Sequence, residues 1–281
     1  MADVGKMPPR IRPGLIGNSL DMTDEYAGAA EFYDYVVPYA TREDVQFFVD
    51  EARAAKGPVL ELGCGSGRVL IPTARAGVAI TGLDLSPAML ELCRTKLRAE
   101  PPDVQSRVDL HQGDMTAFDL RRKFALVTLP FRPFQHLVTV DAQVACLTCI
   151  HRHLEDGGRL ILDLFNPSLD YLVNRPIDVE MPEGPPFTMP DGRQVVRTFK
   201  IPNQDRFTQV NDIELIYNVT TDGRSERHVH AFKMRYLFRF EAEHLLARCG
   251  FVVDQLYAGY DRSSYGSTYP GELIFVARKA S

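Results

Sequence analysis

Between residues 59 and 165, short unbroken apolar runs alternate with segments whose apolar residues recur at helical spacing. Short apolar runs predict buried strands, and apolar residues three and four positions apart predict helices. Strand–helix units with short connections indicate a parallel sheet covered by helices on both faces, a doubly wound α/β fold. The predicted strands are 59–62, 78–83, 108–112, 124–129 and 159–165, and the predicted helices start at 68 or cover 87–98 and 141–154.

A different pattern begins after residue 167. Proline, glycine and acidic residues come first, and three β-rich runs then cover 194–201, 207–220 and 225–238. The last two runs are separated by Thr221-Asp222-Gly223, a turn suited to a hairpin. The α/β pattern then returns with a helix at 241–249 and strands at 251–256 and 272–277. We therefore expect an N-terminal segment 1–40, an α/β domain of 41–167 and 239–281, and an antiparallel β insertion 168–238 after the fifth strand.

Composition narrows the class of protein. The chain has 281 residues, 45% of them hydrophobic, and a formal net charge of -5, which disfavours nucleic acid as a partner because phosphate backbones attract basic surfaces. No apolar run approaches the roughly 20 residues that span a bilayer, and the N-terminus lacks the apolar stretch of a signal peptide. The five scattered cysteines do not suggest a disulfide framework. We expect a cytoplasmic protein without a membrane partner.

The strongest chemical signal is the segment VLELGCGSGR, in which a buried strand runs into a glycine-rich turn. Glycine is needed where the backbone turns sharply or must lie against a ligand. Asp84 ends the next strand, where a carboxylate can accept both ribose hydroxyls of a nucleoside. Asp114 and Met115 end the third strand and offer a partner and an apolar face to an adenine. These three strand ends outline one adenosine-shaped groove.

In these motifs the chain resembles the class I S-adenosylmethionine-dependent methyltransferases, over roughly 59–165 and 241–277. The resemblance implies a seven-stranded Rossmann-like sheet with a final antiparallel strand. It also implies that the glycine loop holds the methionine part of the cofactor, Asp84 the ribose and Asp114 the adenine. A dinucleotide-binding oxidoreductase is disfavoured because its third glycine would fall on Arg68. The residues expected to bind S-adenosylmethionine are Tyr26, Tyr33, Glu61, Gly63, Cys64, Gly65, Gly67, Asp84, Leu85, Met89, Asp114, Met115 and Leu129.

In this family the methyl acceptor lies beyond the fourth strand, where the sequence reads LPFRPFQHL. Phe131 and Phe134 are candidate walls, and Arg132 and His136 are candidate catalytic groups beside Gln135. His136 titrates near neutrality, so it suits a general base or a group that orients an amine. Its alternative role is to cap the helical region that follows.

The N-terminal segment EYAGAAEFYDYV resembles one found in small-molecule N-methyltransferases, including those acting on aminosugars. The resemblance implies that Tyr26 and Tyr33 close over the cofactor, with Tyr33 also a catalytic candidate. Alternatively, Phe32, Tyr33 and Val36 form one helical face that packs on the domain.

In related enzymes the position of the β insertion carries a substrate cover or a dimer surface, so a homodimer is a further expectation. The last insertion run alternates polar and apolar residues, and its polar face is more simply a solvated strand surface than part of a pocket. No metal site is expected, because Cys146 and Cys149 fit the apolar face of a packed helix. The polar candidates on the last run are His228, His230, Lys233 and Arg235.

The leading hypothesis is methyl transfer to a small-molecule acceptor at N, O or S. The alternatives are a methyltransferase acting on a macromolecule and a nonenzymatic adenosine-binding protein.

Overall fold

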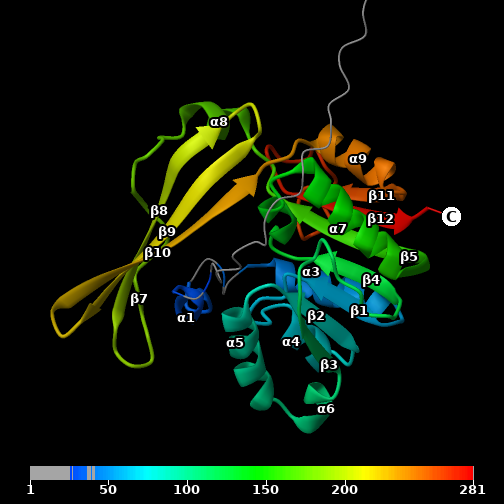
Figure 1. Ribbon diagram of the computed structural model, residues 1–281, viewed down its shortest axis with the longest axis horizontal. Helices are drawn as coiled ribbons and strands as arrows, with labels where there is room; N and C mark the ends of the chain where they lie inside the picture. Colours follow the sequence, from blue (N-terminus) through cyan, green and yellow to red (C-terminus); the bar gives the residue numbers. More distant parts are fainter. Residues whose placement is uncertain (1–25, 27, 37–38, 40–41, 281) are drawn as a thin grey trace, which may run out of the picture.

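A computed structural model describes residues 26, 28–36, 39 and 42–280, which form two β-sheets. The larger sheet has seven strands in the order β11-β12-β5-β4-β1-β2-β3 (Figure 1). All its pairings are parallel except those of β12, which is antiparallel to both β5 and β11. The seven strands are β1 Val59–Leu62, β2 Ile80–Asp84, β3 Val108–Gln112, β4 Phe124–Leu129, β5 Leu154–Leu164, β11 Phe251–Tyr257 and β12 Leu273–Lys279.

Helices cover both faces of this sheet, as the doubly wound pattern predicts. Successive side chains of a strand point to opposite faces, so Leu126 of β4 joins one buried cluster and Val127 the other. The cluster that contains Val127 packs α7 and α9 on the sheet, and the cluster that contains Leu126 packs α3, α4 and α5. The helices are α1 Ala30–Tyr33, α3 Asp44–Ala54, α4 Leu70–Arg75, α5 Pro87–Arg98, α6 Pro102–Gln105, the 3-10 helix η1 Pro133–His136, α7 Val140–His153, α8 Leu169–Asn174 and α9 Arg239–Arg248.

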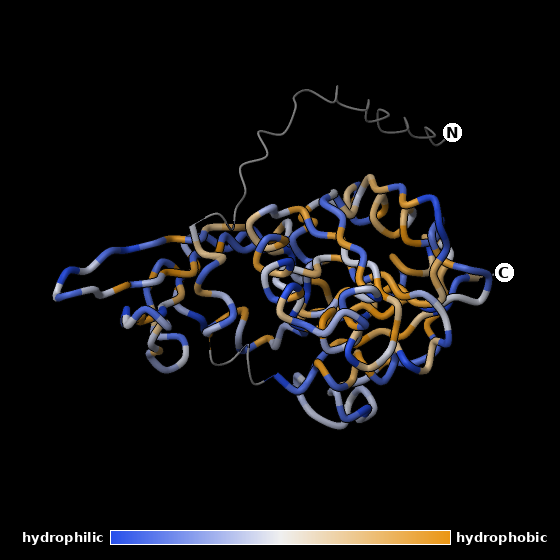
Figure 2. The backbone as a smooth tube through the Cα atoms, turned by 90° about the horizontal axis from the view of Figure 1, so that it is seen from below, coloured by the Kyte–Doolittle hydropathy of each residue, from blue (hydrophilic) through white to orange (hydrophobic). Residues whose placement is uncertain are grey.

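The insertion forms the second sheet, which projects from the α/β domain (Figure 2). Its long strands β8, β9 and β10 are antiparallel neighbours. The predicted turn between β9 and β10 is present: Asp222 and Gly223 have φ of 49° and 77°, as a two-residue hairpin requires. The strands of the insertion are β6 Met181–Pro182, β7 Phe187–Thr188, β8 Gln194–Asp205, β9 Val210–Thr221 and β10 Arg224–Arg235.

Two predicted strand boundaries are wrong by four or more residues, each for a local reason. Strand β8 continues past residue 201 through Pro202, and the pairing register shifts between Lys200 and Asn203, so the proline's missing N–H is bypassed. Strand β5 begins at Leu154 instead of residue 159. Its register on β4 shifts after Leu154, at a bulge that contains Gly157 with φ 73°.

Helix α1 lies between α5 and the insertion in Figure 1. Phe32 of α1 is fully buried, and its ring stacks on Tyr217 of β9 with 4.9 Å between centroids. Phe32 therefore has a packing role, but it packs on the insertion instead of the α/β domain that the alternative predicted. Among the residues that the structure describes, no helix has the length and apolar character that crossing a bilayer requires.

Candidate active site

The turn after β1 is shaped by glycines that touch other parts of the site. Gly63 has φ 68°, and a Cβ there would lie 2.6 Å from the Cβ of Pro133. Gly65 has φ 53°, and its N–H donates to Asp84 Oδ2 at 2.7 Å. Because side chains would both strain the backbone and collide, only glycine allows this loop to lie against the ends of β2 and η1.

Asp84, at the end of β2, fixes two loops at once. Its Oδ1 accepts the N–H of Ser86 at 2.9 Å, and the Ser86 hydroxyl caps α5 by accepting the N–H of Met89 at 3.1 Å. At the end of β3, Asp114 Oδ1 accepts the N–H of Thr116 at 2.7 Å. Each carboxylate oxygen has two lone pairs, so both side chains keep capacity for a ligand while being held in place.

These strand ends line one continuous cavity of about 1350 Å³. A drug-sized ligand occupies a pocket of roughly 300–1,000 Å³, so this cavity has room for a cofactor and an acceptor together. The predicted residues along its walls are Tyr26, Tyr33, Glu61, Gly63, Cys64, Gly65, Asp84, Leu85, Met89, Asp114, Met115, Arg132 and His136.

Two residues predicted to bind the cofactor lie outside this lining. Leu129 is fully buried in the core beneath the end of β4, because the last residue of the strand points into the helix layer. Gly67 makes the turn into α4, and a Cβ there would lie 2.7 Å from Cys93 Sγ. Both therefore contribute to packing.

Glu61 supplies a direct test of whether the loop fits S-adenosylmethionine. Its side chain is 2% exposed, and its Oε2 has no hydrogen-bond partner among the residues that the structure describes. Burial raises the pKa of this carboxyl to about 8. A buried carboxylate without a partner is costly, and the ammonium group of an amino acid is the partner it lacks. The loop thus fits the methionine end of the cofactor, whose amino group Glu61 would hold.

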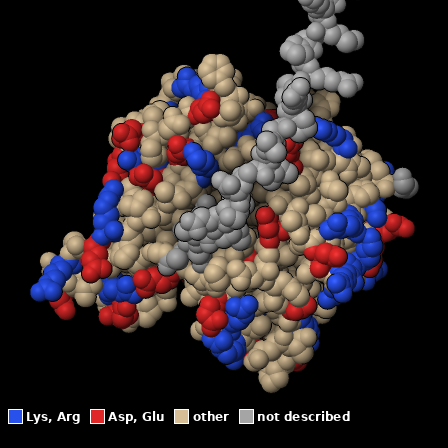
Figure 3. Space-filling model, in the orientation of Figure 1, with Lys and Arg blue, Asp and Glu red and all other residues tan. Residues whose placement is uncertain are grey.

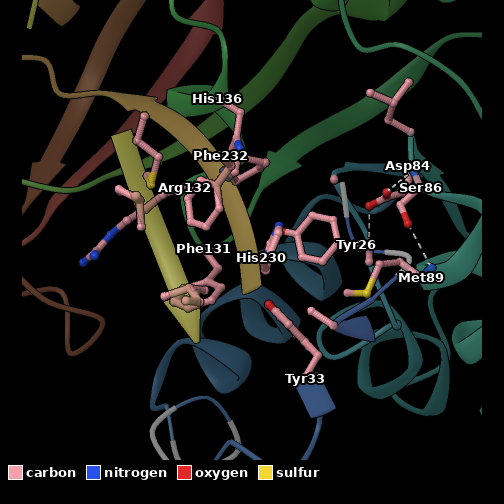
Figure 4. Close-up of a pocket in the computed structure, with 18 of the residues that line it drawn as sticks. Tyr26, Tyr33, Asp84, Ser86, Met89, Phe131, Arg132, His136, His230 and Phe232 are labelled. Carbon is pink, nitrogen blue, oxygen red and sulfur yellow. Dashed lines mark hydrogen bonds between the residues drawn. The ribbon is translucent and has the colours of Figure 1, made fainter. Parts of the chain in front are cut away.

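Aromatic rings line the part of the cavity nearest the insertion (Figure 4). The centroid of Tyr26 lies 4.3 Å from that of His230, which lies 4.8 Å from that of Phe232. Phe232 in turn stacks on His136 at 5.0 Å. The acceptor chamber, as we name it, is this aromatic compartment together with Tyr39, Phe131 and Arg197. Its walls come from the N-terminal segment, the turn after β4 and the inner face of the insertion.

The turn after β4 has an unusual backbone. Phe131 and Arg132 have φ of 63° and 70°, a left-handed conformation that costs free energy in residues other than glycine. The N–H of Phe131 donates to Asp163 Oδ2 at 3.0 Å, which holds the turn in place. This turn directs the Phe131 ring toward the cavity and places Pro133 in contact with Gly63. The strained backbone therefore shapes the site.

The candidates within LPFRPFQHL have different surroundings. Burial lowers the pKa of His136 to about 4, so its imidazole is neutral at physiological pH. The Arg132 guanidinium pairs with Glu272 at 2.7 Å and turns away from the rings in Figure 4. Phe134 is fully buried in the core, so the prediction that it forms a wall is wrong. Gln135 is also buried. Its side chain accepts the N–H of Phe165 and donates to the carbonyl of Arg235.

Strand register explains which insertion residues face the cavity. Arg197, Tyr217 and His228 form one cross-strand row, and Phe199, Leu215 and His230 form the next row on the same face. His230 is 2% exposed and lines the cavity, so the solvated strand face predicted for it is wrong. Lys233 also lines the cavity, where it pairs with Asp212. His228 and Arg235 lie outside the lining: His228 contacts Phe32, and Arg235 pairs with Glu241.

Sequence reasoning missed Tyr39, Arg197 and Tyr217. The Arg197 side chain is 1% exposed, donates to the Tyr39 hydroxyl, and lies 4.6 Å from the Tyr39 ring centroid. The alternation of β8 places Arg197 in step with buried Val195, which is the one signal that could have marked it as an inward charge.

The fold is that of the class I S-adenosylmethionine-dependent methyltransferases, and the cavity at its strand ends fits that class. Residues 59–158 match the family model of the methyltransferase domain. The chain is 27% identical over 226 residues to the dTDP-3-amino-3,4,6-trideoxy-alpha-D-glucopyranose N,N-dimethyltransferase of Streptomyces venezuelae, covering 78% of this chain and 86% of that one.

Two solved structures share this fold. The methyltransferase CcbJ of Streptomyces caelestis superposes with a TM-score of 0.75 at 24% identity, covering 93% of this chain and all of that one. The SAM-bound amino pentose methyltransferase CalS10 of Micromonospora echinaspora gives a TM-score of 0.65 at 25% identity, covering 88% and 96%. Similarity to these proteins extends across the insertion as well as the α/β domain.

Proposed function

We propose that this enzyme methylates a nucleophilic N, O or S atom of a small-molecule acceptor by in-line displacement. The observation that carries the proposal is the single cavity that runs from the nucleoside groove into a chamber roofed by the insertion. Bound S-adenosylmethionine supplies an electrophilic methyl group on its sulfonium. The protein's task is to align the acceptor with it, and alignment alone can contribute roughly 7–11 kcal/mol to lowering the barrier.

The N-terminal segment is proposed as a cover over the cofactor. Asp34, one residue after α1, accepts the Ser66 hydroxyl at 2.6 Å and pairs with Lys96 at 2.8 Å. These contacts support the segment's attachment to the glycine loop and α5. They hold Tyr26 and Tyr33 over the cavity, where burial raises the pKa of both phenols and keeps them neutral hydrogen-bonding groups.

His136 is proposed to orient the acceptor. A group with a pKa of about 4 is a weak base, so its lone pair serves better as a hydrogen-bond acceptor than as a proton acceptor. Arg132 is proposed to act through Glu272, by holding the turn that carries Phe131 and Pro133. The aminosugar and amino pentose methyltransferases to which the chain is similar make an amine the first acceptor to test.

The insertion is proposed as the substrate cover. A roofed chamber favours a small acceptor over a macromolecule, and positive and negative side chains alternate over the face of the insertion seen in Figure 3. A nonenzymatic adenosine-binding protein would need no second compartment. The outer face of the insertion exposes Val196 and Val229, 44% and 50% accessible, and is the proposed surface for a homodimer.

The test has two stages. Calorimetry is expected to show binding of S-adenosylmethionine and S-adenosylhomocysteine, and absence of both would overturn the proposal. Mass spectrometry would then follow methyl transfer to a panel of amino sugars, simple amines, phenols and thiols. Cofactor binding with transfer only to proteins or nucleic acids would replace the small-molecule proposal with the macromolecular one.

A further inference from the structure

Arg197 differs from the other arginines that line the cavity. Arg42 and Arg68 both pair with the buried carboxylate of Asp44, and Arg132 pairs with Glu272. Among the described residues, Arg132 leaves one buried donor, Nε, without an acceptor, whereas the fully buried Arg197 leaves two, Nε and Nη1. Its Nη2 contacts the Tyr39 hydroxyl and Glu183, and the Tyr217 hydroxyl also contacts the guanidinium.

The contact with Glu183 is incomplete. Glu183 Oε2 lies 3.2 Å from Nη2 of Arg197, but the two are not aligned as a hydrogen bond, and this oxygen has no other partner in the described chain. Glu183 follows the short strand β6, and its side chain is 38% exposed. Its carboxylate can therefore turn toward solvent without breaking another side-chain contact. The Glu183 backbone would stay in place, because its N–H donates to the carbonyl of Arg197 at 3.1 Å.

We infer that Arg197 binds an anionic group of the acceptor, a carboxylate or a phosphate, and that the Glu183 carboxylate occupies this place until the acceptor displaces it. The inference rests on the proposed function and names the acceptor's chemical class. A guanidinium offers parallel N–H groups that match a carboxylate or phosphate, and Glu183 meets Arg197 at a single oxygen. When the acceptor displaces the Glu183 carboxylate, the buried N–H donors of Arg197 become available to the acceptor.

The position of Arg197 sets the shape of such an acceptor. The Tyr39 ring packs on Arg197 at 4.6 Å and on the Phe131 ring at 4.9 Å. One tyrosine ring thus separates the anion position from the turn after β4, beside which the methyl group is transferred. The acceptor is therefore an acid whose nucleophilic atom lies several bonds from its anionic group, with an apolar part between aromatic walls.

Small aromatic anions test directly whether Arg197 binds an anionic group. Benzoate and phenyl phosphate would be titrated into the protein saturated with S-adenosylhomocysteine, with neutral benzamide as the matched probe and ligand-observed NMR as the readout. Both anions are expected to bind more tightly than benzamide. Arg197→Gln is expected to weaken anion binding about tenfold, which is the effect of losing one charged hydrogen-bonding group. The ratio of the two anion affinities distinguishes a carboxylate site from a phosphate site.

Two further variants keep the inference falsifiable. Glu183→Gln removes the competing charge and is expected to strengthen anion binding at least threefold, whether or not the Arg197 variant folds. Arg227→Gln is the control, because Arg227 pairs with Glu180 at 2.8 Å on β10 outside the cavity lining. The inference would be overturned if anion binding does not improve in the Glu183 variant. It would also be overturned if anion binding falls as much in the Arg227 variant as in the Arg197 variant. Affinity for S-adenosylhomocysteine is measured throughout, so loss of the proposed function itself would be seen separately.

Discussion

The cofactor groove and the acceptor chamber are built in opposite ways. The groove comes from three consecutive strand ends, β1 to β3, whose loops are tied together by backbone N–H groups bonded to Asp84. The chamber comes from three distant segments, and its Tyr39–Arg197 contact joins residues 158 positions apart. A cofactor groove built at one sheet edge can be common to enzymes that methylate different acceptors. A chamber made of separate segments can change without disturbing that groove. The following predictions test that separation.

The largest expected effect lies at Glu61, in the floor of the groove. Burial raises the pKa of this carboxyl from 4.5 to about 8, so between these pH values the folded protein keeps a proton that the unfolded chain has released. The free energy of unfolding should therefore fall as pH rises through this window, by up to about 1.4 kcal/mol per pH unit. Glu61→Gln should remove this slope in urea titrations at a series of pH values.

Exposed Glu155 of β5 provides the matched control, since Glu155→Gln should keep the wild-type slope. The Glu61 variant should also bind S-adenosylmethionine more weakly, because it loses the carboxylate that we expect to face the ammonium group. A variant with both an unchanged slope and unchanged cofactor affinity would contradict the role assigned to Glu61.

Asp84→Ala is expected to weaken binding of S-adenosylhomocysteine by about 2–4 kcal/mol, measured by calorimetry. The substitution removes the predicted ribose partner and leaves the N–H groups of Gly65 and Ser86 without their acceptor. Asp109→Ala, on the exposed side of β3, should leave the affinity unchanged. Equal affinities of the Asp84 variant and the wild type would remove the ribose assignment.

The same separation explains what the sequence could reveal. Gly63, Asp84 and Asp114 are local features, each at the end of a predictable strand, so the fold and the groove follow from pattern alone. The chamber does not, because the inward direction of Arg197 and His230 depends on strand register and on an N-terminal segment that packs over them. Nor could the left-handed turn at Phe131 and Arg132 be predicted, since neither residue favours it.

His136→Ala should act on the chamber alone. We expect turnover with an acceptor from the panel to fall about tenfold while affinity for S-adenosylhomocysteine changes less than twofold. The pH profile of turnover between neutral and mildly alkaline pH should keep its shape, because an imidazole with a pKa of about 4 does not titrate there. Exposed His244 of α9 gives the control substitution. A neutral-pH inflection that vanishes in the His136 variant would restore the role of general base.

The smallest effect is expected where the two regions meet, at the ends of α1. Asp34 ties this helix to the groove through Ser66 and Lys96, and Glu31 ties it to the insertion through Arg193 at 2.6 Å. Asp34→Ala should weaken S-adenosylhomocysteine binding about fivefold with less than about 1 kcal/mol lost in stability, since the ion pair is partly exposed. Glu31→Ala, the matched change at the other end, should leave that affinity unchanged. If calorimetry instead shows equal losses in both variants, attachment to the insertion also controls the groove, and the two regions are energetically coupled.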